Sequence, residues 1–220
     1  MVKHASHYKA TTLFYYQSSQ KPRLLVVSGF HGDEAGVIAP LTDFITSNPD
    51  RLPPFLFVPV ASPSAVARGM RLSTHNVDMN RSYFPNTSVE EAQALMHFLE
   101  GRTFDMAYSF HEHPGETRFY LYDMGRVVDG KKMATLNEKM DALGVPLFDG
   151  IDDDQDPALG RKITRGYASE SPDVAVRHGF FNGFLFTSHT TTRHVNLEIP
   201  GAVSTKKKAA IVAAIFDTLG

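Results

Sequence analysis

The chain has 220 residues, 42% of them hydrophobic, and a formal net charge of -2. This length suits a single domain with a sizeable core over residues 1–220, and the near-neutral charge predicts no nucleic-acid partner. The absence of cysteine excludes disulfides, a thiol nucleophile and cysteine-ligated metal, so a transition metal would need His, Asp or Glu ligands. No signal-like N-terminus and no apolar stretch of about 18 residues is present, which predicts a cytoplasmic protein without a membrane span.

The first part of the chain predicts two strands, a helix and a third strand. Residues 12–16 and 23–28 are rich in strand-forming side chains, and we predict that they pair as a hairpin across the intervening turn. Residues 34–46 carry apolar side chains at helical spacing, with Pro40 as an irregularity. Residues 55–60 form a continuous apolar run, which is typical of a buried strand.

The middle of the chain predicts a long loop, a helix and a strand. Residues 61–85 are polar, and loops of this length are often functional. Ser88-Val89-Glu90-Glu91 fits a capping box, and apolar residues follow it at helical spacing as far as Gly101. Residues 104–110 predict a strand that carries His111 at its carboxyl end.

The last part predicts strands at residues 118–122, 183–187 and 194–199 and helices at residues 131–143 and 204–219. The lysine run at residues 206–208 is expected to be solvated. The segment at residues 149–160 is acidic and contains Asp152, Asp153, Asp154 and Asp156. It lacks the spacing of an EF-hand, so we expect a solvated loop rather than a calcium site. The alternation of strands and helices predicts an α/β fold of three layers, with helices on both faces of a mixed, mostly parallel sheet.

Candidate metal ligands follow two of the predicted strands. His31 and Glu34 stand three residues apart in a glycine-lined turn, and His111 ends a later strand. Because the carboxyl ends of parallel strands meet at one edge of a sheet, these side chains can converge. Two imidazoles and a carboxylate are a complete protein ligand set for a catalytic zinc ion. His113 is the alternative to His111, and a structural turn with Glu34 at the start of a helix is the alternative to a metal site.

Several motifs, taken together, resemble zinc carboxypeptidases of the carboxypeptidase A type. Their order and spacing agree with that family over residues 24–201, and the Asp-x-Asn-Arg-x-x-Phe-Pro element is the most specific among them. The matching segments are His31-Gly-Asp-Glu34, Ser62-Pro-Ser-Ala65, Arg68-Gly-Met-Arg71, Val77-Asp-Met-Asn-Arg-Ser-Tyr-Phe-Pro85, His111 and Asn196-Leu-Glu-Ile199.

The resemblance implies a single zinc ion per chain, bound by His31, Glu34 and His111. It implies that Glu198 is the general base on the attacking water, a role that suits a carboxylate close to zinc. It also implies that Arg71 stabilises the oxyanion of the tetrahedral intermediate. Arg68 is the local alternative to Arg71, and Asp33, Glu112 and His113 leave a two-metal site open.

Further residues are implied to bind or orient the substrate. Asn80 and Arg81 match a pair that binds the substrate carboxylate, where a guanidinium can bind in a bidentate manner. Asp78 matches a residue that accepts a hydrogen bond from the first zinc histidine, here His31. Tyr167 is the nearest candidate for a tyrosine that closes over the substrate.

The function implied is hydrolysis of an amide bond next to a free carboxylate in a small peptide. The length and the His-Gly-Asp-Glu variant are similar to small cytoplasmic murein-peptide amidases. The alternative is an N-acyl-amino-acid deacylase of the succinylglutamate desuccinylase/aspartoacylase type, and a more remote one is a non-catalytic peptide-binding domain.

Overall fold

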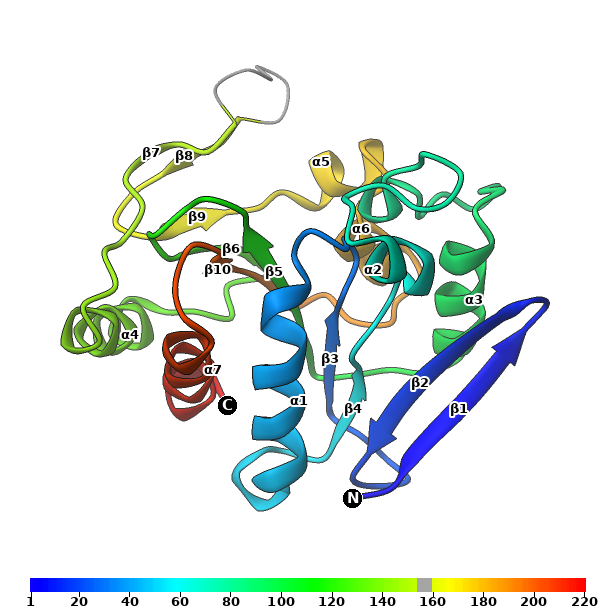
Figure 1. The fold of residues 1–220 in the computed structure, drawn as a ribbon, viewed down its shortest axis with the longest axis horizontal. Coiled ribbons are helices and arrows are strands. Elements are labelled where there is room, and N and C mark those ends of the chain that lie inside the picture. The colour runs from blue at the N-terminus through cyan, green and yellow to red at the C-terminus, as the bar shows by residue number, and fades with distance from the viewer. Residues whose placement is uncertain (154–159) are drawn as a thin grey trace.

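A computed structural model describes residues 1–153 and 160–220. In this part of the protein a mixed β-sheet lies between two layers of helices (Figure 1). Its eight strands occur in the order β1-β2-β4-β3-β5-β10-β6-β9. A separate antiparallel pair joins β7 (Gly150–Ile151) and β8 (Lys162–Ile163). The strands of the main sheet are β1 (Lys3–Tyr8), β2 (Thr11–Gln17), β3 (Leu24–Ser28), β4 (Phe55–Val58), β5 (Met106–His113), β6 (Tyr120–Met124), β9 (Tyr167–Ser169) and β10 (His194–Pro200).

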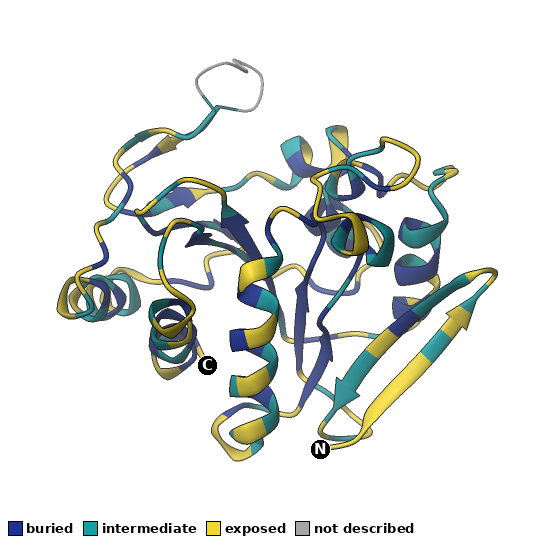
Figure 2. Cartoon of the chain, in the orientation of Figure 1, coloured by how far each residue is buried: buried dark blue, intermediate teal, exposed yellow. Residues whose placement is uncertain are grey.

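The centre of the sheet is parallel. Strands β4, β3, β5 and β10 run in the same direction, and β6 is antiparallel to β10 and parallel to β9. Every residue of β3 and β4 is buried (Figure 2). Because both faces of these strands are covered, their side chains are apolar on both sides rather than alternately apolar and polar. This explains the continuous apolar runs in the sequence.

Helices cover both faces of the sheet, as predicted. The first core contains Leu24 and Val26 of β3 together with α1 (Ile38–Ser47), α4 (Gly130–Ala142) and α7 (Thr205–Leu219). The second contains Leu25 and Val27 together with α3 (Glu90–Leu99) and α6 (Phe181–Thr187). Shorter helices are α2 (Pro63–Arg68) and α5 (Pro172–Arg177), with 3-10 turns at Ala35–Val37, Pro49–Arg51 and Met79–Arg81.

The predicted hairpin between residues 12–16 and 23–28 is wrong. Strand β2 pairs with β1 on one side and with β4 on the other, so β3 lies one strand further in. The pattern of β1, Lys-His-Ala-Ser-His-Tyr, is polar because this edge strand is largely exposed (Figure 2). A polar edge strand carries little of the hydrophobic signal on which strand prediction depends.

Other predicted elements also need correction. Residues 183–187 belong to helix α6 and not to a strand, because a short apolar run does not distinguish the two. The predicted loop at residues 61–85 contains α2 and a 3-10 turn, and β6 begins at Tyr120 rather than at residue 118.

The capping box predicted at the start of α3 does not form. Val89 precedes α3 without a side-chain cap, and Glu91 instead accepts hydrogen bonds from Ser62 and Ser64 at the start of α2. Asp154 and Asp156 of the acidic segment lie outside the described residues.

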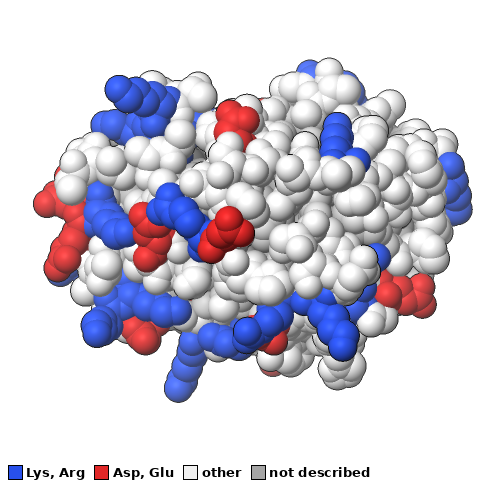
Figure 3. Space-filling model, turned by 90° about the horizontal axis from the view of Figure 1, so that it is seen from below, with Lys and Arg blue, Asp and Glu red and all other residues white. Residues whose placement is uncertain are grey.

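Charged side chains are mixed on the surface. Seen from below, Lys and Arg are interspersed with Asp and Glu (Figure 3). Among the described residues, no helix combines the length and the apolar character that crossing a membrane requires.

Lys208 is an exception to the expectation that residues 206–208 are solvated. It is only 6% exposed, and its Nζ lies 2.9 Å from Glu112 Oε1, on the strand that carries His111. Gly36 leaves the space for this ion pair, since a Cβ there would lie 2.5 Å from Lys208 Nζ. Helix α7 is therefore connected directly to the strand end where the predicted ligands gather.

We expect Lys208→Met to lower the free energy of unfolding by about 3 kcal/mol, because it leaves a buried carboxylate without its partner. Burial already raises the pKa of Glu112. Without Lys208 that pKa rises further, so the loss grows as the pH rises and is larger at pH 8 than at pH 5. Urea denaturation at both pH values measures this effect. The matched control is Lys206→Met, which replaces an exposed lysine of the same helix and is expected to change stability by less than about 0.5 kcal/mol.

Candidate metal centre

The turn after β3 brings His31 and Glu34 to the edge of the sheet. Gly29 adopts a left-handed backbone conformation with φ of 65°, and a Cβ at this position would lie 2.9 Å from the carbonyl oxygen of Pro59. Gly32 packs against the backbone of α2, where a Cβ would come within 1.9 Å of the carbonyl oxygen of Ala65. Both glycines are thus required by the close approach of neighbouring backbone.

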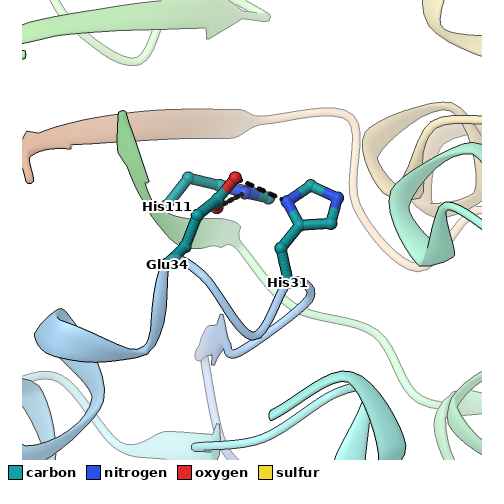
Figure 4. A group of neighbouring side chains, drawn as sticks. All are labelled: His31, Glu34 and His111. Atoms are coloured by element: carbon teal, nitrogen blue, oxygen red, sulfur yellow. Dashed lines mark hydrogen bonds and ion pairs between the residues drawn. The ribbon is translucent and has the colours of Figure 1, made fainter. Parts of the chain in front are cut away.

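His31, Glu34 and His111 point toward one another (Figure 4). Glu34 Oε1 lies 2.6 Å from His31 Nδ1, and Glu34 Oε2 lies 2.9 Å from His111 Nδ1. All three residues are at most 5% exposed, and their ligand atoms lie within 4.8 Å of one another. The ring of Phe30 stacks on His111 with 4.9 Å between centroids, which limits how the imidazole can turn.

This donor set fits a divalent transition metal. Two imidazole nitrogens and a carboxylate are ligands of the type and number found in catalytic sites. His31 Nε2 lies 3.0 Å from Asp78 Oδ1, so the second ring nitrogen has a carboxylate partner and Nδ1 is directed to the centre, as in histidines that bind metals. His31, Glu34 and His111 therefore form a group that could hold a metal ion.

His113 is not part of this centre. Its Nδ1 lies 2.8 Å from the hydroxyl of Tyr120, while Glu112 pairs with Lys208. Among the described residues, His31, Glu34 and His111 are the only group of three that could hold a metal ion. The geometry therefore favours His111 over His113 and one ion over two.

The protonation of the metal-free centre follows from its hydrogen bonds. Burial by itself would lower the pKa of His31, but hydrogen bonds with Asp78 and Glu34 outweigh it and raise the pKa to about 9. Burial would likewise raise the pKa of Glu34, yet His111 and His31 hold it well below its usual range. Since a histidine must be neutral to bind a metal, binding here displaces a proton.

Arg71 and Asp78 extend the centre. Arg71 Nη1 donates to Glu34 Oε1 at 3.2 Å, and its Nη2 donates to Asp78 Oδ2 at 3.0 Å. Burial would raise the pKa of Asp78, but the hydrogen bond from His31 and the nearby positive charges lower it to about 2. Arg68, the alternative to Arg71, donates to the carbonyl oxygen of Ser73 and does not line the cavity at the metal ligands.

Asn80 and Arg81 stand in the 3-10 turn that Asp78 caps. Asp78 Oδ1 accepts a hydrogen bond from the backbone N–H of Asn80, and Asp78 Oδ2 lies 3.8 Å from Arg81 Nε. The Arg81 side chain is 42% exposed, so its guanidinium can still bind a ligand in the cavity that it lines.

Glu198 reaches the same edge from the neighbouring strand. In the sheet it pairs with His111 of β5 on one side and Tyr120 of β6 on the other. Its Oε1 accepts a hydrogen bond from Asn196 Nδ2 at 3.0 Å. Burial raises the pKa of Glu198, and His111 offsets part of this effect. A carboxylate with a raised pKa is better suited to accept a proton than an ordinary surface carboxylate.

Two adjoining cavities share Arg71, Asn80, Arg81 and Glu198 as lining residues and therefore form one site. The outer cavity, of about 390 Å³, contains the three metal ligands. The inner cavity, of about 150 Å³, continues over Ser109 and His194.

Tyr167 does not join this site. It lies in β9, where its hydroxyl donates to Asp123 Oδ2 at 3.2 Å, and it lines neither cavity. Position in the chain was a poor guide here, because the side chain points to β6. Tyr120 and Tyr122 of that strand line the outer cavity instead.

Sequence reasoning missed a chain of polar side chains beneath Glu198. Ser109 Oγ donates to Asn196 Oδ1 at 2.8 Å and lies 2.8 Å from His194 Nε2. Burial lowers the pKa of His194 to about 3, so the ring is neutral. Because the Ser109 hydroxyl gives its proton to Asn196, His194 Nε2 is the donor in the hydrogen bond to Ser109. The signal was present, because residues 194, 196 and 198 alternate along one strand and share a face of the sheet.

Solved structures identify the fold, although no protein-family model and no curated protein sequence matches the chain. A candidate metallopeptidase from Shewanella denitrificans superposes with a TM-score of 0.76 at 21% identity, covering 99% of this chain and 82% of that one. For a metallo-carboxypeptidase from Burkholderia cenocepacia the TM-score is 0.64 at 13% identity, covering 94% and 59%. For a succinylglutamate desuccinylase/aspartoacylase from Rhodobacter sphaeroides it is 0.57 at 17% identity, covering 94% and 57%.

The chain therefore has the fold of metallopeptidases and metallo-carboxypeptidases. This confirms, at the level of the fold, the resemblance to zinc carboxypeptidases drawn from the motifs. Within that fold, the chain is similar in extent to the candidate metallopeptidases of Shewanella, whereas it spans less than two thirds of the Burkholderia and Rhodobacter chains.

Proposed function

We propose that the protein is a zinc-dependent amide hydrolase of carboxypeptidase type, acting on a small peptide next to a free carboxylate. The observation that carries this proposal is the convergence of two groups on one cavity. His31, Glu34 and His111 form a group that could hold a metal ion, and Glu198, Arg71 and Arg81 line the cavity beside it. Zinc bound there would supply Lewis acidity, which makes water a nucleophile near neutral pH.

Proton transfer, oxyanion stabilisation and substrate binding are assigned to side chains around the cavity. Glu198 accepts a proton from the attacking water and delivers it to the nitrogen of the leaving amine. Arg71, already directed at the centre by Glu34 and Asp78, stabilises the negative charge on the carbonyl oxygen. Asn80 and Arg81 bind the substrate carboxylate and so position the amide bond against these groups.

A murein peptide is the substrate that we propose first, and an N-acyl amino acid is the second candidate. The second is supported by the likeness in fold to the desuccinylase/aspartoacylase structure. Incubating the zinc-loaded protein with murein peptides, acetyl-amino acids and succinyl-amino acids separates the two. Ligand binding without hydrolysis of any of them would instead indicate a non-catalytic peptide-binding domain.

We expect Arg81→Ala to raise KM about 10- to 100-fold for a peptide with a free carboxylate, because a charged hydrogen-bonding partner is lost. The same peptide with a terminal amide offers no such charge, so its already low turnover changes little. Steady-state kinetics on both substrates measures the difference. Arg23→Ala serves as control, since Arg23 is a 67% exposed arginine paired with Asp105 and lines neither cavity of the site. An equal loss on both substrates would contradict carboxylate binding by Arg81.

A further inference from the structure

A buried ion pair stands on the far face of the strand that carries His111. Side chains alternate along β5, so His111 points into the site and Glu112 points to the face that α1 and α7 cover. There Glu112, 4% exposed, meets Lys208 of α7, 6% exposed, with Oε1 and Nζ 2.9 Å apart. Two charges have thus been taken out of water directly behind the candidate metal ligands.

Stability alone does not account for this pair. A buried ion pair is generally no more stable than apolar side chains of similar volume, because removing both charges from water costs about as much as their attraction returns. The helix dipole also opposes a lysine near the N-terminus of a helix, and Lys208 lies in the first turns of α7. An ion pair at this position is therefore expected to have a role that two apolar residues could not fill.

Glu112 contacts both Glu34 and the turn that follows it. Its backbone N–H donates to Glu34 Oε2 at 3.4 Å, and the same oxygen lies 2.9 Å from His111 Nδ1. The chain after Glu34 enters the 3-10 turn Ala35–Val37, and the Glu112 carboxylate interacts with the backbone N–H of Gly36 in that turn. Glu112 therefore contacts the carboxylate of Glu34 through its backbone and the turn after Glu34 through its side chain.

Lys208 is the partner that orients the Glu112 carboxylate. The first turn of α7 is fixed by Ser204, whose side chain accepts a hydrogen bond from the backbone N–H of Lys207. Lys208 Nζ extends into the space beside Gly36, where a Cβ would lie 2.5 Å from it and 2.8 Å from Glu112 Oε1. The turn after β3, the end of β5 and the start of α7 thus meet at one ion pair. A shift of either charged group would therefore reach the turn that carries the candidate ligand.

We propose that Lys208 and Glu112 are positioning residues, which hold Glu34 in the orientation in which it meets His31 and His111 and so increase the affinity of this centre for a divalent metal. The proposal rests on the proposed function, in which the metal is zinc. Neither residue binds the metal itself. They act as outer partners, which fix the orientation of a ligating side chain.

The test removes the ion pair without leaving a buried charge. In the double variant Lys208→Met/Glu112→Met both new side chains are unbranched and apolar, so the stability of the metal-free protein is expected to stay close to that of the wild type. Its affinity for zinc is expected to fall about 10- to 100-fold, the usual loss when an outer partner of a metal ligand is removed. Urea denaturation measures the stability, and competition for zinc with a chromophoric chelator measures the affinity. A merely structural ion pair would leave the affinity unchanged once stability is retained.

Gly36→Ala is a second variant, and it keeps both charges. Gly36 lies outside the left-handed region, so alanine adds no backbone strain, but its Cβ would displace Lys208 Nζ and Glu112 Oε1. The affinity for zinc is expected to fall about tenfold. The control is Lys139→Met/Asp217→Met, which removes a partly exposed ion pair of 3.5 Å between α4 and α7 and is expected to leave the affinity unchanged.

Zinc binding is measured without substrate, so failure of this proposal is distinct from failure of the proposed function. If the wild type binds zinc but hydrolyses none of the proposed substrates, the hydrolase proposal fails, and the variants still decide the role of Lys208 and Glu112. Wild-type affinity in the double variant or in Gly36→Ala, or an equal fall in the control, would overturn the positioning role. If the double variant does not fold, Gly36→Ala decides alone. Absence of zinc binding by the wild type would overturn both proposals.

Discussion

Glu198→Gln is expected to lower kcat about 10²- to 10⁴-fold while the protein retains its metal. Glutamine keeps the shape of the side chain and an oxygen that can accept the hydrogen bond from Asn196 Nδ2. It has no group that can take a proton from water, so the loss falls on kcat rather than on KM. Elemental analysis and steady-state kinetics on the zinc-loaded variant measure the two quantities.

Two features distinguish this role from a structural one. The acid limb of the pH profile of kcat/KM, which reports ionisation of this base, disappears in Glu198→Gln. Glu100→Gln is the matched control, because the Glu100 side chain is 77% exposed at the end of α3. Full activity of Glu198→Gln would remove this residue from the mechanism, and loss of the metal would mean that it is a ligand.

His111→Ala is expected to abolish activity and to weaken metal binding by more than about 100-fold. Loss of an outer partner of a ligand alone costs about 10- to 100-fold, and here a ligand itself is removed. Elemental analysis after dialysis measures the metal, and circular dichroism verifies that the variant is folded.

His113→Ala is the control for this change, since His113 lies two residues further along the same strand and contacts Tyr120. It is expected to retain one metal per chain. Metal loss in His113→Ala with retention in His111→Ala would reverse the assignment, and a reproducible content near two ions per chain would overturn the single-metal site.

The convergence of the candidate metal ligands was predictable because these residues lie at the ends of apolar runs. Strand β3 delivers His31 and Glu34, and β5 delivers His111, as buried parallel strands are expected to do. The positions of Arg71, Asn80 and Arg81 around the same cavity followed from motif spacing rather than from periodicity. Their chemical roles remain predictions that the variants above test.

Other parts could not be read from the sequence, for physical reasons. Strand β1 is polar because it lies at an exposed edge, and α6 has an apolar run too short to separate helix from strand. Ser109 and His194 lie within predicted strands, and the hydrogen bond between them depends on which neighbours the sheet places beside them.

The place of β10 in the sheet has a consequence for how the protein matures. This strand lies between β5 and β6, although both of them precede it in the chain. Until β10 is synthesised and inserted, β5 and β6 have no shared partner, and Glu198 is absent from the edge where His31, Glu34 and His111 meet. Such a late, non-local pairing slows folding. A nascent chain therefore contains His31, Glu34 and His111 well before it contains Glu198, so under the proposed function capture of the ion and competence for chemistry would be separated in time.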